Sequence, residues 1–196
     1  MATLDNISAF ATLPLYAQSL IAIRMLRRAV LAKLPPTDPE SQLLTQACDI
    51  AESCCLSGDG VYHNRALFDR VMALTDLTTH RPERDWLRRA AHCAIDSLRA
   101  ADACQERAFE TSVTVSSQAT IAALGEDANL SRMQITILLA GDIDLLLFAC
   151  SEVDKLPARN PAANYQGLGQ HVFSRLAPVH PLIFVPREPS PQDLAR

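Results

Sequence analysis

The sequence has few of the residues from which β-sheets and catalytic loops are usually built. Of its 196 residues only six are glycine, and 5% are aromatic. The short signatures of several enzyme classes are also missing: there is no HExxH zinc motif, no GxSxG nucleophile elbow and no phosphate-binding GxxxxGK[ST] loop. Helical di-metal proteins need Glu-x-x-His on two helices, and that pattern does not occur. No local motif therefore names a reaction.

Proline is distributed unevenly, and it divides the chain. Seven of the twelve prolines lie at or after Pro157, whereas residues 83–156 contain none. Because proline removes a backbone donor and clashes with the preceding turn, it is rarely found inside helices. We therefore predict a helical bundle over 1–156, followed by a mostly irregular tail over 157–196. Part of this Pro-rich tail, Leu182 to Val185, is expected to pack on the bundle as an extended segment.

Apolar residues recur at helical spacing in five segments before residue 125, and the frequent alanines favour closely packed helices over sheet. We predict helices over 12–34, 37–57, 63–74, 83–106 and 109–124. At the start of the predicted helix 37–57, Thr37 and Glu40 match a capping box. On the fourth helix we expect the arginines at 84, 88, 89 and 99 to face solvent. With one more helix, discussed next, the fold class is an all-α bundle of five or six helices.

The stretch MQITILLAGDIDLLLFAC, residues 133–150, permits three interpretations. A membrane span is disfavoured by its two central acids, Asp142 and Asp144, each of which costs about 2.5–3.5 kcal/mol on insertion scales. A β-hairpin would turn at Gly141–Asp142. We favour a helix over 131–155, apolar nearly all round and hence central in the bundle. If Gly141 breaks that helix, Asp142 becomes a cap.

Charge and cysteine usage limit the class of partner and the compartment. The net charge is −4, and the basic group Arg24, Arg27, Arg28 and Lys33 is interleaved with apolar residues. We interpret it as a solvated helix face and expect no nucleic-acid partner and no membrane partner. The N-terminus MATLDNISAF does not resemble a signal peptide, and the six cysteines form no CxxC pair. A reduced, cytoplasmic protein is expected.

Two groups of residues are candidates for a functional site. His92 and Asp96 are four residues apart and share a helix face; with Asp142 and Asp144 they would form an interior polar site. Both pairs also have a purely structural interpretation. His92 and Asp96 would be a pair on the helix surface, and Asp142 and Asp144 would be helix caps or members of ion pairs. Tyr62, His63 and Asn64 follow the glycines of SGDG and would form a recognition loop or a plain turn. We expect no metal and no cofactor.

These observations favour a non-enzymatic function. Long helices with small side chains offer flat faces that can pair, and the proline tail can dock on a neighbour. The leading hypothesis is a cytoplasmic protein–protein interaction or regulatory module that self-associates as a homodimer. The alternative is a small-molecule or metal-dependent enzyme, whose interior site would collect His92, Asp96, Asp142 and Asp144.

Overall fold

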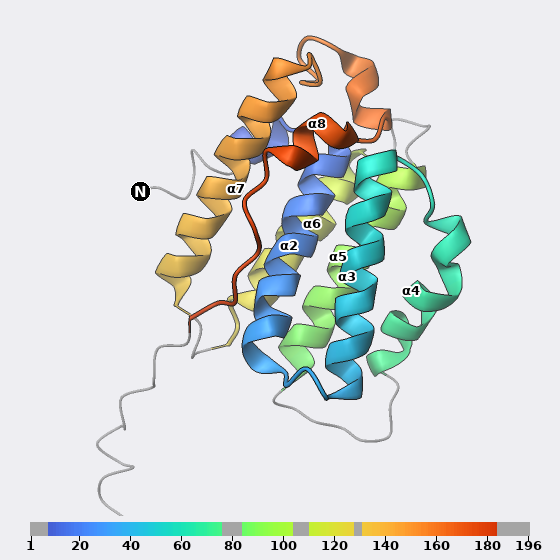
Figure 1. Ribbon diagram of the computed structural model, residues 1–196, viewed down its shortest axis with the longest axis vertical. Helices are drawn as coiled ribbons and strands as arrows, with labels where there is room; N and C mark the ends of the chain where they lie inside the picture. The colour runs from blue at the N-terminus through green and yellow to red at the C-terminus, as the bar shows by residue number, and fades with distance from the viewer. Residues whose placement is uncertain (1–7, 76–83, 104–109, 128–130, 184–196) are drawn as a thin grey trace, which may run out of the picture.

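The described part of the chain is built from α-helices. The computed structural model describes residues 8–75, 84–103, 110–127 and 131–183, and these contain no β-strand. Its α-helices, in chain order, are α2 (Leu15–Lys33), α3 (Pro39–Ser57), α4 (Arg65–Met72), α5 (Asp85–Ala103), α6 (Glu110–Leu124), α7 (Arg132–Glu152) and α8 (Gly169–Ser174). Three short 3-10 helices accompany them: η1 (Tyr62–Asn64), η2 (Ala73–Thr75) and η5 (Pro161–Tyr165). The predicted all-α bundle is confirmed, and Figure 1 shows its long helices.

The centre of the bundle is α2, not α7. Of the 19 residues of α2, 15 are buried, because α3, α5, α6 and α7 pack around it. By contrast, only 33% of the apolar window of α7 is buried, so the prediction that α7 is central is wrong. Figure 1 shows α7 at one edge of the bundle, inclined to the other long helices. The apolar content of α7 is high, but much of it faces outwards.

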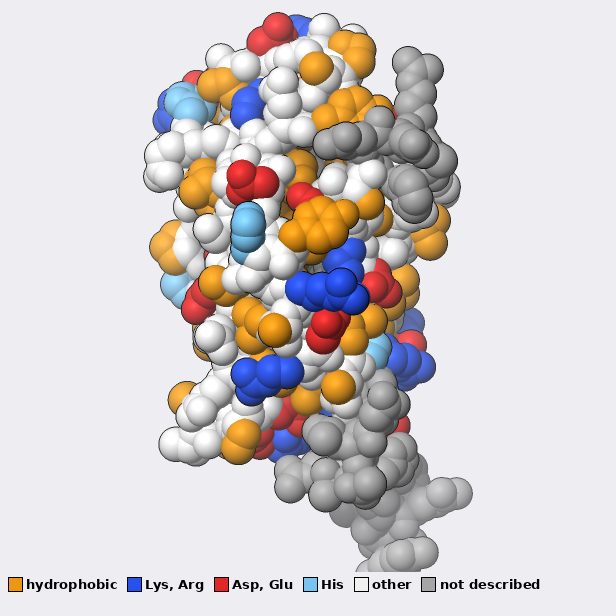
Figure 2. Space-filling view, turned by 90° about the vertical axis from the view of Figure 1, so that its right-hand side faces the viewer, with side chains coloured by type: hydrophobic (Ala, Val, Ile, Leu, Met, Phe, Trp, Pro, Cys, Tyr) orange, Lys and Arg blue, Asp and Glu red, His pale blue; other side chains and the backbone are white. Residues whose placement is uncertain are grey.

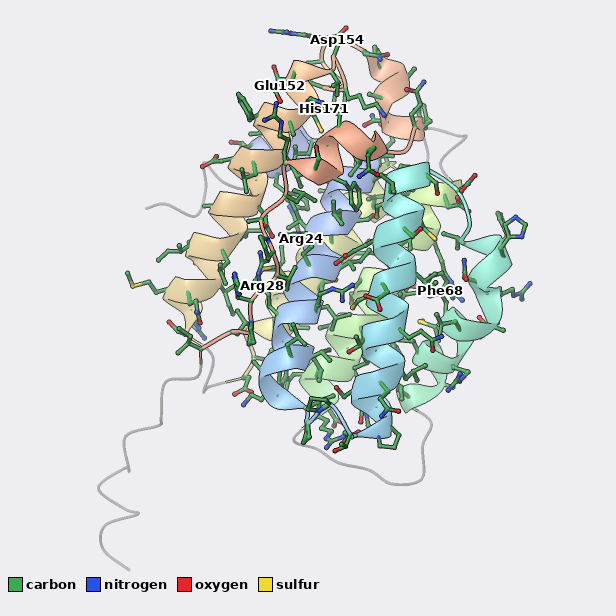
Figure 3. All side chains as sticks on the ribbon, viewed as in Figure 1. Arg24, Arg28, Phe68, Glu152, Asp154 and His171 are labelled. Atoms are coloured by element: carbon green, nitrogen blue, oxygen red, sulfur yellow. The ribbon has the colours of Figure 1, made fainter. Side chains whose placement is uncertain are left out.

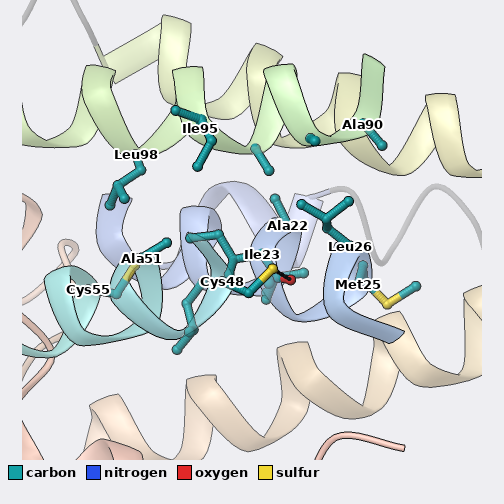
Figure 4. Packing of buried hydrophobic residues seen from close by; sticks show 14 of the residues in the cluster. Ala22, Ile23, Met25, Leu26, Cys48, Ala51, Cys55, Ala90, Ile95 and Leu98 are labelled. Carbon is teal, nitrogen blue, oxygen red and sulfur yellow. Dashed lines mark hydrogen bonds between the residues drawn. The ribbon is translucent and has the colours of Figure 1, made fainter. Parts of the chain in front are cut away.

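Small side chains set the packing around α2. The buried residues of α5 include four alanines and a serine, and those of α6, which packs on both α5 and α2, include Val113, Ser117 and Thr120. Short side chains allow two helix axes to approach closely, so these contacts need few aromatic residues. Figure 4 shows the other side of the core, where Ile23 of α2 lies near Cys48 of α3. The scarcity of aromatic residues in the sequence is thus accommodated by close helix packing.

The first turn of α3 differs from the predicted capping box. Asp38 is the N-cap, and its Oδ1 accepts a hydrogen bond of 2.8 Å from the backbone N–H of Glu40. The Glu40 carboxylate instead accepts hydrogen bonds of 3.0 and 3.2 Å from Arg88. Arg88 is only 4% exposed, so its predicted solvent-facing position is also wrong. An aspartate directly before Pro39 caps the helix, which leaves Glu40 free to pair with α5.

Residues 133–150 lie within one continuous helix. Ser131 caps α7 by accepting a hydrogen bond from the N–H of Gln134, close to the start of the predicted helix over 131–155. The helix runs through Gly141 without a break, so neither the hairpin nor the cap at Asp142 is formed. At its end Glu152 accepts a hydrogen bond from Arg175 and pairs with His171 of α8, 3.1 Å away (Figure 3). The last turn of α7 is thereby joined to α8.

The C-terminal part contains more helix than predicted. Within the expected irregular tail lie η5 and α8, after which an extended segment returns along α2 and α7 (Figure 1). We call residues 177–183 the strap. Its Leu182 is 3% exposed, in keeping with the expectation that this residue packs on the bundle, whereas residues 184 and 185 of the predicted segment lie outside the described residues.

Candidate functional site

The four polar residues proposed as an interior site do not converge. His92 lies between α5 and α4, with its Nε2 3.2 Å from the carbonyl oxygen of Val71. Asp96 and Asp144 are exposed. Only Asp142 is fully buried, and it faces α2. Nowhere in the described residues do three or more His, Cys, Asp or Glu side chains form a group suited to a metal ion.

Asp142 belongs to a buried ion-pair network, as its structural interpretation as an ion-pair member allows, but its partners on α2 were not predicted. Arg28 binds it with both amino groups, at 2.6 Å from Oδ2 and 3.0 Å from Oδ1, in the paired geometry typical of strong arginine–carboxylate contacts. Arg24 lies one turn away on α2 and approaches the same carboxylate at 3.5 Å. All three residues are at most 4% exposed. Figure 3 shows both arginines on the side of α2 that faces α7.

The basic group on α2 is therefore not a solvated face. Two of its members, Arg24 and Arg28, are buried against Asp142. The other two also have acidic partners: Arg27 pairs with Asp49 and Glu52 of α3, and Lys33 with Asp127. The four cations thus serve contacts with three different parts of the chain. They do not form one accessible basic surface.

The side of α7 opposite Asp142 is exposed and, apart from Asp144, apolar. Met133 is 73% exposed, and Ile137 and Phe148 are each 58% exposed. Their spacing of 4 and 11 residues places them on one side of the helix. The buried residues Ile135, Asp142 and Leu146 lie on the other side. We call Met133, Ile137, Ala140, Gly141, Asp144 and Phe148 the outer face of α7.

By length and composition alone, α7 could also cross a membrane. A single helix that meets this criterion is weak evidence for a membrane span. Asp142 near the middle of α7 is bound by two arginines of α2, so this helix is tied to the bundle by charge as well as by apolar contact. That a membrane is not the partner remains a prediction from the two aspartates.

The predicted recognition loop forms η1 beside a surface pocket. Asn64 donates from its side chain to the carbonyl oxygen of Gly60 at 2.7 Å, so it is a structural member of the turn. Tyr62 and His63 are exposed. A pocket of about 330 Å³ is lined by Val61, Tyr62, Arg65, Asp69, Arg99, Asp102 and Ala103. Figure 2 shows the face of the molecule that carries α4, where charges of both signs lie among apolar side chains.

The charges of this pocket neutralise one another. Asp69 binds Arg99 at 2.6 Å and Arg65 at 3.5 Å. Asp102 lies 3.3 Å from the hydroxyl of Tyr16, which also approaches the carbonyl of Gly58 at 3.0 Å. Burial raises the pKa of Asp102 above its ordinary value, and the nearby Asp59 adds to this. The polar side chains of the pocket therefore already have partners. Among the residues that line it there is no nucleophile activated by a neighbouring base.

Four of the described cysteines, Cys48, Cys54, Cys55 and Cys150, are buried thiols with suppressed reactivity. Burial raises the pKa of Cys48 from 9.0 to about 12 and those of Cys54 and Cys150 to about 11. The pKa of Cys55 is shifted in the same direction, also by burial. Since the thiolate is the reactive and metal-binding form, these four side chains are poor candidates for catalysis or metal binding.

Burial of these thiols predicts a loss of stability in alkali. The unfolded chain releases the Cys48 proton near its ordinary pKa of 9.0, whereas the folded chain retains it to about 12. Unfolding is thus favoured as pH rises between these values, by up to about 1.4 kcal/mol per pH unit for this thiol. Urea unfolding at pH 8 and pH 10.5 should show the decline, and Cys48→Ala should reduce its slope. An equal slope in both proteins would contradict the assignment.

No family model, curated protein or solved structure matches this chain. The function is therefore argued from the geometry of the molecule itself.

Proposed function

We propose that the protein is a cytoplasmic, non-enzymatic interaction module that self-associates through the outer face of α7. The observation that carries the proposal is the exposure of Met133, Ile137 and Phe148 on one side of one helix. Single exposed apolar residues are common on any protein surface. Three large ones on one side of a single helix, with Asp144 as the one charged residue among them, are more typical of an interaction site. The residues proposed for an enzyme site lie apart, so the enzyme alternative gains no support.

A second copy can be placed on the outer face so that its large apolar ends meet, with Ile137 set against Asp144 of the other copy. A two-fold dimer requires a surface that is complementary to itself. If two α7 helices pair antiparallel about Ala140–Gly141, residues equally far on either side of this midpoint oppose each other. Met133 then meets Phe148 of the other copy. A Cβ built on Gly141 would have no atom within 4 Å, so a second helix can approach here.

The size of the outer face indicates a reversible dimer. α7 has 21 residues, which gives it a length of about 32 Å. A single helix face of this length is small beside the roughly 800 Å² per partner of a standard interface. We therefore expect a dissociation constant on the order of 10 μM, not an obligate dimer.

Ile137→Asp tests the proposal, with Val115→Asp on α6 as a matched control. Both side chains are β-branched, helical and 58% exposed, but Val115 lies outside the outer face. In the antiparallel pair the carboxylate introduced by Ile137→Asp would oppose Asp144 of the second copy. Sedimentation across a concentration series should show a dissociation constant raised about tenfold or more by Ile137→Asp and unchanged by Val115→Asp.

Two results would contradict self-association through α7. One is a wild-type chain that stays monomeric at about 1 mM, far above the expected dissociation constant. The other is an equal effect of the two substitutions. Flotation with lipid vesicles, run in parallel, identifies the alternative partner: a wild-type monomer that floats, when Ile137→Asp does not, would assign the outer face to a membrane.

A further inference from the structure

The strap is held in the manner of a bound peptide. The carbonyl of Ala177 accepts a hydrogen bond of 2.7 Å from Nη2 of Arg24. The N–H of Leu182 donates to the backbone carbonyl of Arg28 at 3.2 Å, and the N–H of Ile183 donates to Oε1 of Gln134 at 2.7 Å. Each of these contacts uses the main chain of the strap. Extended peptides are commonly recognised in this way, by main-chain hydrogen bonds and a few side-chain pockets.

Only one side chain of the strap is fully buried. Leu182 is 3% exposed, whereas Ile183 is 67% exposed, and the two prolines of the strap are exposed as well. The strap site, defined by Arg24, Arg28 and Gln134, therefore recognises an extended backbone and one leucine. Most other side chains of the strap have little influence on whether it fits.

The strap leaves the charge of its site incompletely balanced. Arg24 and Arg28 share the single carboxylate of Asp142, and Arg28 takes its two short contacts. The Nε of Arg24 has no hydrogen-bond partner although it is buried, and the nearest Asp142 oxygen is 3.5 Å away. The hydrogen bond that Arg24 forms with the strap is to a neutral acceptor, the carbonyl oxygen of Ala177. A carboxylate here would form a charge-assisted bond, roughly twice as strong as a neutral one.

We propose that the strap site is a peptide-binding site for an acidic, extended segment of another protein. Such a segment would bring a carboxylate to Arg24 and a leucine to the position of Leu182. The chain's own strap is the resident competitor, and its tether gives it an effective concentration of about millimolar. Weak ligands are thus excluded, and a ligand that adds the missing negative charge displaces the strap. This site is separate from the outer face of α7.

The experiment uses full-length Leu182→Asp, in which a charge at the buried position releases the strap. Two labelled peptides with the sequence of residues 176–183 are compared, one carrying Ala177→Glu and the other Ala177→Gln. They differ only in charge. By fluorescence anisotropy, the Glu peptide should bind Leu182→Asp at least fivefold tighter than the Gln peptide, with a difference that shrinks in high salt. Wild-type protein should bind the Glu peptide at least tenfold more weakly than Leu182→Asp.

Equal affinity for the two peptides, or no binding by a Leu182→Asp protein with a wild-type circular dichroism spectrum, would overturn the proposal. Amide hydrogen exchange of the wild-type chain tests it without any substitution. A displaceable strap opens locally, so the amides of Leu182 and Ile183 should exchange many-fold faster than those in the middle of α2. Exchange of Leu182 as slow as that of α2 would make the strap a permanent part of the core and exclude its displacement.

Discussion

Asp142→Ala is expected to lower the free energy of unfolding by about 3–5 kcal/mol, because it leaves buried arginine charge without its partner. Asp142 is 3% exposed and provides the one carboxylate that Arg24 and Arg28 bind. Domains of ordinary stability have about 5–15 kcal/mol in total, so the variant should be close to unfolding. Urea denaturation followed by circular dichroism measures the loss.

Asp144→Asn is the matched control for this experiment. Asp144 lies on the same helix, two residues away, and is exposed. Its substitution should change the free energy of unfolding by no more than about 0.5 kcal/mol. A triple substitution of Asp142, Arg24 and Arg28 by leucine or methionine should recover much of the loss, since removing all the buried charges removes their desolvation cost. A small effect of Asp142→Ala, or an equal effect of Asp144→Asn, would show that the network is solvated.

The contrast between Asp142 and Asp144 also marks the limit of what the sequence predicts. Apolar periodicity and proline placement predict helices well, because both act within a few residues of the chain. They do not predict which helix lies at the centre. α7 is more apolar than α2, yet α2 is central, and its two arginines meet a carboxylate more than a hundred residues away. No local pattern contains that information.

Arg88 shows the same limit on a smaller scale. On α5 it neighbours other arginines, and the local pattern predicts an exposed face. In the folded chain Glu40 lies opposite and binds it, 48 residues distant in sequence. The predicted Thr37–Glu40 capping box fails partly for a local reason, because Asp38 takes the capping position. Its other member, Glu40, is bound by the distant Arg88, so here too an ion pair across the fold replaces a local interaction.

The candidate site was less predictable than the fold. Helical spacing places His92 and Asp96 on neighbouring turns, but it does not specify what each side chain meets. The exposed face of α7 was missed because the whole helix was assigned to the interior. One signal was available in the sequence. In a helix without a break, Asp142 and Asp144 point to nearly opposite sides. Both sides could be buried only if each aspartate had a buried partner of its own. The structure provides a buried partner network for Asp142 alone.

Gly167→Ala is expected to destabilise the protein by about 3 kcal/mol, at the upper end for overpacking. A Cβ at this position would lie 2.3 Å from the carbonyl carbon of Ser57 and 2.4 Å from the nitrogen of Gly58. These are backbone atoms at the end of α3, and they cannot move aside as a flexible side chain can. Gly58 itself caps α3 in the left-handed region, with φ of +78°. The next residue, Leu168, is fixed by a hydrogen bond to the carbonyl of Cys55.

Gly141→Ala is the control for this prediction, and the opposite sign is expected. Its Cβ would meet nothing within 4 Å, and alanine is favoured over glycine inside a helix by about 1 kcal/mol. Measured on the monomer at low protein concentration, Gly141→Ala should raise the urea midpoint while Gly167→Ala lowers it. At high concentration the same added Cβ stands at the centre of the outer face, where it obstructs close helix approach. A variant that gains stability as a monomer and loses self-association would separate the two roles of α7, whereas a gain in both would contradict antiparallel pairing about Ala140–Gly141.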